Sequence, residues 1–435
     1  MGEQSSLRVG EATFGGADVA AAEVSMDTRV KPAYDESRGM RVSRPREGNR
    51  RMLPSQRALF DIPREVCYLN AASYSPLPLR TQEAARAAVG RKGQPWLIDN
   101  AFAQAQYERT RKAAAALIDA DPADVALTPS VGYGVSTAAK IFKVPRGVRV
   151  LVLADDHSSA VLEWMTRAGE GGFAIETVRR PADGDWTQAV LAAIERPGAA
   201  PIAIASISSV HWSDGGVVDL TKIAPALRAR GAALLVDATH SAGVLDLDVR
   251  ALDPDFVAFP TYKWLIGPYA RAFLYVAKRH QHGTPLEQTS HGRRAVRAEQ
   301  KVYFADTSYV GDARRFDMGE RDHFISMEMA SIGMEMVAAW GRAAIVERLA
   351  MLTARLADGL RGNDVAIPDT RVRAPHILSL GFPDGMPAGL IERLAAENVY
   401  AAPRLGRLRI SPHVYNDETD VDRFVDVFRK AKRVV

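Results

Sequence analysis

Asp237 and Lys263 each follow an apolar segment of the chain, within three residues of its end. Residues 232–236 read AALLV before Asp237, and residues 256–260 read FVAFP before Lys263. Short apolar runs that end in polar residues are typical of strands buried on both faces of a sheet. We expect two adjacent strands, so that the acid and the lysine lie together at the edge where these strands end.

A lysine at the edge of a buried strand could act as a nucleophile. Loss of hydration lowers the pKa of its ammonium group, and the neutral amine can then form a Schiff base. Pyridoxal 5'-phosphate is held in this way, and it also needs a carboxylate beside its pyridine nitrogen. Lys263 and Asp237 are therefore predicted to be catalytic and to bind this cofactor. An ordinary acid and lysine at strand ends is the alternative that the pair alone leaves open.

Three motifs follow one another along the chain. VDATHSAG surrounds Asp237, PTYKWLIGP surrounds Lys263, and LRISPHVYN lies near the C-terminus. Together they resemble motifs of the class V aminotransferases, a family of fold type I pyridoxal phosphate enzymes that includes cysteine desulfurases, kynureninases and isopenicillin N epimerase-like enzymes. The resemblance spans about residues 66–430. It implies an α/β fold with a mostly parallel seven-stranded sheet, a smaller α+β C-terminal domain and a homodimer.

The resemblance also points to the cofactor's phosphate and ring. DVALTPSVGYGVSTAAKIF reads as a strand, a turn and a helix, an arrangement that directs backbone N–H groups at an anion. Ser130, Val131 and Gly132 lie at this turn and are expected to bind the phosphate. His157 follows the apolar segment VRVLVLADD and is expected to stack on the pyridine ring. A solvated loop histidine is the alternative.

Three more residues complete the predicted cofactor set. His240 follows Asp237 by three positions and is expected to contact the phenolic oxygen of the cofactor. Thr261 and Tyr262 offer hydroxyl groups where desulfurases have serine and histidine. In RRFDMGERDHF, Glu320 replaces a threonine that the family directs at the partner subunit's phosphate, so either Arg321 takes over that contact or the segment has another role.

An arginine is expected to bind the α-carboxylate of the substrate, because its planar guanidinium matches a carboxylate. In GRLRISPHVYN, Arg407 and Arg409 alternate with apolar residues, so either arginine could serve if they share one face of a strand. The motif resemblance selects Arg409 and leaves Arg407 or Arg404 for distal groups of the substrate.

Two other segments are expected beside the substrate. VCYLNAASYSPLP resembles the family's loop on the substrate side of the cofactor, which makes Asn70 and Ala71 plausible neighbours of the substrate. In SSVHWSDGG, His211 is expected near the substrate together with Ser209 and Trp212. A purely structural role for His211 is equally open.

The position of cysteine in the sequence helps to separate the reactions that the family catalyses. A persulfide-forming cysteine desulfurase needs a mobile cysteine shortly before the late arginine, and ENVYAAPRLGRLRIS contains none. Cys67 is the chain's one cysteine and lies in another segment, and it excludes an internal disulfide. The resemblance leaves a lyase or an epimerase, with an aminotransferase as the alternative. A regulator that binds the cofactor or an amino acid without turnover is disfavoured by the intact lysine.

Composition indicates an ordinary globular enzyme. Lysine and arginine number 56 against 52 acidic residues, a net charge of +4, which is too small to indicate a nucleic-acid partner. No run of eighteen apolar residues and no secretory leader is visible, so we expect a cytoplasmic protein without a membrane partner. No metal site is predicted.

The chain is expected to divide into four parts. Residues 1–52 mix Gly, Ser, Arg and acids without hydrophobic periodicity and are predicted to be a disordered extension, upstream of a start at Met52. Residues 53–82 are predicted to form a leading segment, which belongs to the small domain and lies on the substrate side. Residues 83–320 are predicted to form the large cofactor-binding domain and residues 321–435 the small domain.

Overall fold

The structure, a computed structural model, describes residues 52–433, so the predicted disordered extension lies outside it except for Met52. One sheet contains β2 (Val125–Thr128), β3 (Arg149–Leu153), β4 (Ala174–Val178), β5 (Ile202–Ser208), β6 (Ala233–Asp237), β7 (Phe256–Pro260) and β8 (Ala272–Val276). Their order is β2-β8-β7-β6-β5-β3-β4. Within this sheet, β8 runs antiparallel to both of its neighbours and the other pairs are parallel. The predicted mostly parallel seven-stranded sheet is confirmed.

The strands send alternate side chains into two apolar cores, one on each face of the sheet. In β6, Leu234 and Val236 belong to the larger core, whereas Leu235 belongs to the smaller one. The smaller core is covered by α3 (Val131–Ile141) and α4 (Ser158–Gly171). Helices that cover the larger core are α2 (Asn100–Ala116), α5 (Trp186–Glu195), α6 (Leu220–Ala229) and α7 (Val249–Leu252). Burial on both faces is why these strands read as unbroken apolar runs.

The parallel strands β3, β5, β6 and β7 end at the same edge of the sheet. Ligands of open α/β sheets bind outside the carboxyl ends of such strands. Asp237 is the last residue of β6, and Lys263 follows shortly after β7, which pairs with β6. The expected adjacency of the two strands is therefore present.

The C-terminal part builds two small sheets. β9 (Leu378–Leu380), β11 (Ala402–Arg404) and β12 (Arg407–Ile410) form an antiparallel sheet, and β1 (Cys67–Tyr68) pairs in parallel with β10 (Val399–Tyr400). α10 (Leu390–Ala396) and α11 (Glu418–Arg433) accompany them. Strands and helices are thus combined in the C-terminal part, as expected for an α+β domain. The predicted domain boundaries remain a proposal, and the pairing of β1 with β10 supports grouping the leading segment with the C-terminal part.

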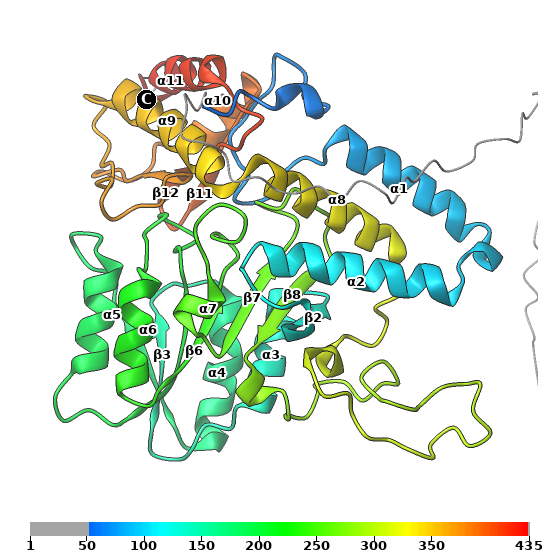
Figure 1. The fold of residues 1–435 in the computed structure, drawn as a ribbon. Coiled ribbons are helices and arrows are strands. Elements are labelled where there is room, and N and C mark those ends of the chain that lie inside the picture. The colour runs from blue at the N-terminus through cyan, green and yellow to red at the C-terminus, as the bar shows by residue number, and fades with distance from the viewer. Residues whose placement is uncertain (1–51, 434–435) are drawn as a thin grey trace, which may run out of the picture. The chain divides into compact units, whose positions relative to one another are not determined.

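Two long helices connect the sheets. Figure 1 shows α8 (Phe324–Trp340) beside α1 (Leu79–Lys92) and α2, and α9 (Arg342–Leu360) beside α11. A Cβ atom on Gly333 of α8 would lie 2.4 Å from the Leu265 carbonyl oxygen, so only glycine lets α8 pack this closely on the loop that carries Lys263. Among residues 52–433, no single helix is long and apolar enough to span a membrane, although α8 and α9, bent by 81° where they meet, together reach that length and composition.

Short 3₁₀ helices complete the described part of the chain. They are η1 (Arg57–Leu59), η2 (Pro95–Leu97), η3 (Pro122–Asp124), η4 (Lys278–His280) and η5 (Ala313–Phe316).

Candidate active site

Lys263 lies in the loop that follows β7, and its side chain is almost fully buried. Its Nζ atom is 3.3 Å from Nε2 of His240. Burial and then the charge of Arg409 lower the pKa of Lys263 to about 7, although the Asp237 carboxylate acts in the opposite direction. A large share of the amine is therefore neutral near pH 7, the form in which it is a nucleophile.

Two carboxyl groups lie close to one another at the ends of β6 and β3. Asp237 is buried, and its Oδ1 accepts a hydrogen bond from the backbone N–H of Thr239 at 2.9 Å. Asp156 accepts from the Ser208 hydroxyl at 2.7 Å, from the Ser208 N–H at 3.1 Å and from the His157 N–H at 2.7 Å. Loss of hydration and the charge of Asp237 raise the pKa of Asp156 to about 7. Sequence reasoning missed Asp156, although it follows a buried strand as Asp237 does.

His157 caps the start of α4 and lies against Trp212. Their ring centroids are 5.9 Å apart, with the planes perpendicular. The His157 Nδ1 atom is 3.2 Å from the Ser159 hydroxyl, and burial lowers the pKa of His157, which favours a neutral ring. A neutral imidazole beside a cavity can present its face or edge to a bound ring, so stacking on the cofactor remains a prediction that this position fits.

Lys263, Asp156, His157 and Trp212 line what we call the lysine cavity, a space of about 710 Å³, whereas Asp237 and His240 lie behind this lining. Its lining comes from the loops after β3, β5 and β7, from the leading segment and from the hairpin between β11 and β12. The lining residues are Ala72, Ser73, Tyr74, Asp156, His157, Ser158, Trp212, Tyr262, Lys263, Tyr269, Pro403, Arg404, Leu405 and Arg409. A cavity of this size is typical of sites for cofactors and small ligands.

Arg409 and Arg404 both reach the lysine cavity and converge on Ser73. Arg409 is buried, and its guanidinium donates to the Trp212 carbonyl oxygen at 2.6 Å and to the Ser73 hydroxyl at 2.7 Å. Arg404 donates to the same hydroxyl oxygen at 2.7 Å. Burial and then the charge of Arg404 lower the pKa of Arg409 to about 9. Arg407, in contrast, donates to the Ser379 hydroxyl at 3.0 Å and does not line the cavity.

The predicted phosphate residues lie beside the lysine cavity, not in its lining. Ser130 caps α3 by accepting from the Tyr133 N–H at 3.0 Å. A Cβ atom on Gly132 would lie 3.8 Å from the Ser159 hydroxyl oxygen, so the start of α3 adjoins the start of α4. The first N–H groups of a helix have no partner within the helix and carry a partial positive charge, which suits an anion. The roles of Ser130, Val131 and Gly132 remain predictions.

His240 and Tyr262 lie next to Lys263, whereas Thr261 is turned into the loop. The Thr261 hydroxyl donates to the Pro268 carbonyl oxygen at 2.6 Å, which satisfies its one proton within the chain. Tyr262 stacks on Tyr269 with ring centroids 3.9 Å apart, and both line the cavity. Thr261 is therefore not brought into the lysine cavity.

Three residues predicted near the substrate lie outside the lysine cavity. Asn70 and Ala71 pair with Ser411 through the backbone, and it is the next three residues that line the cavity. His211 is buried and stacks on Trp186 at a centroid distance of 4.9 Å, with Nε2 3.1 Å from the Ala154 carbonyl oxygen. Burial lowers the pKa of His211 to about 3. Its neighbour Trp212, not His211, lines the cavity.

The segment around Gly319 is held by its own chain. Arg321 forms an ion pair with Asp317 at 2.6 Å, and its guanidinium carbon lies 4.0 Å from the ring centroid of Tyr107. The Gly319 N–H donates to Glu287, and Glu320 is exposed. Arg321 thus has an acidic partner within the chain. Glu320 is a carboxylate, which repels a phosphate group.

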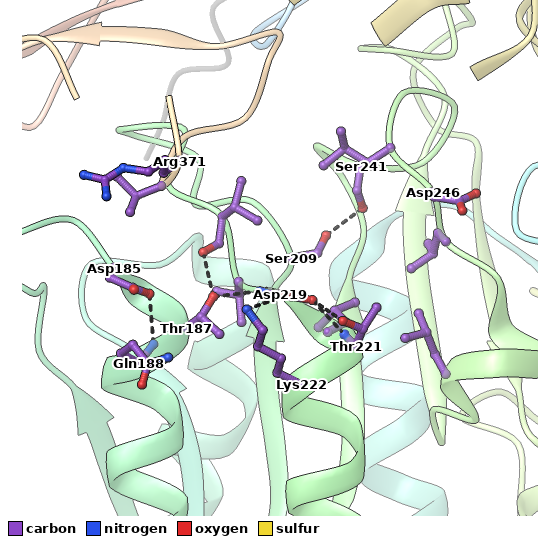
Figure 2. Close-up of a pocket in the computed structure, with 17 residues that line it drawn as sticks. Asp185, Thr187, Gln188, Ser209, Asp219, Thr221, Lys222, Ser241, Asp246 and Arg371 are labelled. Atoms are coloured by element: carbon purple, nitrogen blue, oxygen red, sulfur yellow. Dashed lines mark hydrogen bonds and ion pairs between the residues drawn. The ribbon is translucent and has the colours of Figure 1, made fainter. Parts of the chain in front are cut away.

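A second cavity, of about 280 Å³, adjoins the N-terminal ends of α5 and α6 (Figure 2). We call it the capped cavity, because Asp185 and Asp219 cap these helices through the N–H groups of Gln188 at 3.0 Å and Thr221 at 3.1 Å. Lys222 pairs with Asp219 at 3.1 Å. The Ser209 hydroxyl donates to the Ser241 hydroxyl at 2.6 Å (Figure 2), which places Ser209 outside the lysine cavity.

The chain is similar to proteins of known family. The family described as aminotransferase class-V matches residues 86–424. The chain is 27% identical over 377 residues to isopenicillin N epimerase of Streptomyces clavuligerus, covering 83% of this chain and 94% of that protein. It is 25% identical to the uncharacterized aminotransferase YcbU of Bacillus subtilis, over 73% of this chain and 82% of that protein. It is 29% identical to a probable cysteine desulfurase of Methanothermobacter thermautotrophicus over 49% of this chain and 54% of that protein.

Solved structures show the same fold. The cystine C-S lyase C-DES, in complex with cysteine persulfide, has a TM-score of 0.76 at 19% identity and covers 84% of this chain and 97% of its own. A cysteine desulfurase of Thermococcus onnurineus NA1 has a TM-score of 0.75 at 20% identity and covers 87% and 98%. At these identities the likeness establishes the fold.

Proposed function

The chain belongs to the class-V aminotransferase family, and we propose that it is a lyase or an epimerase that acts on an α-amino acid. Members of this family are pyridoxal phosphate enzymes, and the predicted enzyme class and cofactor are confirmed at this level. One observation carries the proposal for the substrate. A buried lysine with a lowered pKa and a buried arginine without an acidic partner face the same cavity.

The residues present fit pyridoxal phosphate. Lys263 offers a nucleophilic amine, Asp237 a buried carboxylate, and the start of α3 an anion site. When bound, the cofactor supplies an electron sink for charge that develops at the substrate's α-carbon. Asp237 would hold the proton on the pyridine nitrogen, and Ser130, Val131 and Gly132 would hold the phosphate. His157 and His240 would contact the ring and its phenolic oxygen.

The chain's own groups would then orient the substrate and move its α-proton. Arg409 would bind the α-carboxylate through a planar pair of hydrogen bonds, which would fix the orientation of the substrate in the lysine cavity. Lys263, with a pKa of about 7, can take and return a proton near neutral pH. The aromatic rings of Trp212, Tyr262 and Tyr269 would exclude water from this region.

Two features support the lyase or epimerase branch. The Streptomyces relative, which matches along almost its whole length, is named an isopenicillin N epimerase. Cys67 is the chain's one cysteine, is buried, and donates its thiol to the Asp420 carbonyl oxygen away from the lysine cavity. A persulfide-forming desulfurase is disfavoured on this ground. An aminotransferase is the second candidate, supported by the similarity to YcbU.

A panel of amino acids tests the proposal. The protein loaded with cofactor is incubated with L- and D-amino acids, with and without a keto acid, and the products are identified by mass and chirality. Product that forms without a keto acid supports a lyase or an epimerase. Product that strictly requires a keto acid shows an aminotransferase. A change in cofactor absorbance without any product shows a non-catalytic binder and contradicts the proposal.

A cytoplasmic location and a homodimer remain predictions. The homodimer rests on the family resemblance and on the segment around Gly319, which lies at the surface. Light scattering after size exclusion checks it, and a fully active monomer at all concentrations would contradict it.

A further inference from the structure

Two guanidinium groups share one hydroxyl oxygen in the lysine cavity. Arg404 and Arg409 each donate to the Ser73 Oγ atom at 2.7 Å, which takes both acceptor sites of that oxygen. Among residues 52–433, no carboxylate lies within ion-pair distance of either arginine. The Nε atom of Arg409 is buried and has no hydrogen-bond partner. Arg404 and Arg409 are therefore two neighbouring cations that no carboxylate of the described residues neutralises.

The acids near the cavity do not supply that charge. Asp237 and Asp156 lie at the ends of β6 and β3, where backbone and serine donors hold them. An α-amino acid carries one carboxylate, which balances one guanidinium and leaves the other unpaired. Arg409 is buried and Arg404 is partly exposed. The two cations repel each other, most strongly where hydration is lost, so a second carboxylate at Arg404 would relieve that repulsion.

We infer that the substrate carries a second carboxylate on its side chain, which Arg404 binds while Arg409 binds the α-carboxylate. This inference rests on the proposed function. Arg404 lies 5.9 Å from the ring centroid of Trp212, and Trp212 lies against His157. The Trp212 indole thus lies between His157, on the cofactor side of the cavity, and Arg404. The side chain of the substrate lies along this indole. The substrate class is a dicarboxylic α-amino acid.

Paired ligands test this inference. The wild-type protein loaded with cofactor is titrated with aspartate and asparagine and with glutamate and glutamine at constant ionic strength, and the cofactor absorbance gives each Kd. We expect at least one acid to bind about tenfold more tightly than its amide, because a guanidinium bonds a carboxylate through two charge-assisted hydrogen bonds. Arg404→Gln is expected to remove this ratio and to leave the Kd of the amide within about twofold. Arg407→Gln, on the same hairpin but outside the cavity, is the matched control and keeps the ratio.

Three results overturn the inference. Equal affinities of acids and amides for the wild-type protein would show that no second carboxylate is recognised. An equal loss for acid and amide in Arg404→Gln would place Arg404 on the α-carboxylate or in the framework. No absorbance change with any α-amino acid would overturn the proposed function itself, a failure that is distinct from the first two.

A second inference rests on Trp264, which follows Lys263 in the chain. Trp264 is buried, and its indole N–H donates to Nδ1 of His240 at 3.0 Å. An indole N–H can only donate, so Nδ1 must accept, and a neutral imidazole then carries its proton on Nε2. Nε2 is the atom that lies 3.3 Å from Lys263 Nζ. The Nε2–H group therefore points at the lysine amine.

The indole is fixed on several sides. His376 meets it edge to face at a centroid distance of 4.4 Å, and His413 stacks on it at 5.5 Å. His413 also contacts the Trp264 carbonyl oxygen at 3.1 Å, and His376 contacts the His240 carbonyl oxygen at 2.7 Å. Burial and the charge of Lys263 lower the pKa of His240 well below its usual value, so the imidazole stays neutral.

We propose that Trp264 is a positioning residue that holds His240 as the Nε2–H tautomer and thereby keeps Lys263 as a neutral amine. An amine can accept from Nε2–H only through its lone pair, which an ammonium lacks. Without the indole N–H, His240 is free to carry its proton on Nδ1 and to offer the Nε2 lone pair to an ammonium. The charged form of Lys263 then gains a partner, so its pKa rises.

Trp264→Phe tests this role, because it keeps an aromatic ring and removes the N–H. In the protein without cofactor, ¹⁵N NMR is expected to show the wild-type His240 protonated at Nε2 and the variant with a changed tautomer. Competitive acetylation across pH, read by mass spectrometry, is expected to show Lys263 about fivefold less reactive at pH 7 in the variant, as for a rise of one unit from a pKa of about 7. Trp186→Phe is the control, since Trp186 is also buried and donates to Asp214 at 3.3 Å but does not line the lysine cavity.

Two outcomes overturn the second inference. A wild-type His240 protonated at Nδ1 would contradict it directly, whether or not the variant folds. An unchanged tautomer and an unchanged Lys263 pH profile in a folded Trp264→Phe protein would show that the indole serves packing alone.

Discussion

The lysine cavity and the capped cavity are both reached by residues that follow the carboxyl ends of the same sheet, yet their polar groups differ in one respect. In the capped cavity, Asp219 bonds Thr221 and Lys222, and Ser209 bonds Ser241 (Figure 2). These groups satisfy one another and stabilise helix ends.

In the lysine cavity, the cationic side chains are left without acidic partners. Lys263, Arg404 and Arg409 have no carboxylate at ion-pair distance within residues 52–433, and the pKa values of Lys263 and Arg409 are lowered. Strand-end polar residues are thus common to both cavities, and it is the unpaired charge that distinguishes a site prepared for a ligand.

The largest expected effect comes from removing the amine. Lys263→Ala should fold, lose covalent attachment of the cofactor, and lose at least about a thousandfold of activity, because the nucleophile is gone. Absorbance, and mass after borohydride reduction, check this. Lys222→Ala in the capped cavity should keep cofactor and activity. Reducible cofactor still bound to the Lys263→Ala protein would assign the amine to another lysine.

Asp237→Asn should lower turnover about a hundredfold while cofactor binding changes less, because a neutral amide replaces the charge that holds the ring proton. Turnover and cofactor Kd measure the two effects separately. Asp219→Asn keeps a helix cap of similar strength and should leave activity unchanged. Wild-type turnover in the Asp237 variant would make it an ordinary strand-end acid.

Arg409→Lys should raise the apparent KM for the substrate about ten- to a hundredfold, since lysine supplies charge without the planar pair of hydrogen bonds. The absorbance of the bound cofactor should stay intact. Steady-state kinetics of this variant and of Arg407→Lys provide the comparison. A normal Arg409→Lys enzyme beside an impaired Arg407→Lys enzyme would transfer the α-carboxylate role to Arg407.

The smallest effect concerns pH. Capture of free cofactor by the unloaded protein should speed up as pH rises through about 7 and level off above it, because only the neutral Lys263 amine reacts and burial lowers its pKa to about 7. Stopped-flow absorbance between pH 5.5 and 9 follows this, a range chosen around that value. A rate that still rises without levelling off at pH 9, as expected for the ordinary lysine pKa of about 10, would show that the amine is hydrated.

Much of the framework was predictable from the sequence. Strands buried on both faces must be apolar throughout, so β3, β6 and β7 appear as unbroken runs, and the first polar residue behind each run marks the sheet edge. This rule marks Asp237 directly, and Lys263 and Asp156 lie within three residues of the ends of their apolar runs, so the sequence places all three near one edge of the sheet. The motifs around them predicted the family, which the match over residues 86–424 confirms.

The lining of the site was decided by tertiary structure. Ser73 and Arg409 lie far apart in the chain and meet only because residues 70 and 71 pair with Ser411 and turn the next residues into the cavity. His211 turns to Trp186 while Trp212 faces His157, although the two are adjacent and equally plausible in the sequence. Loop side chains take their direction from contacts with distant segments, and local patterns carry no record of such contacts.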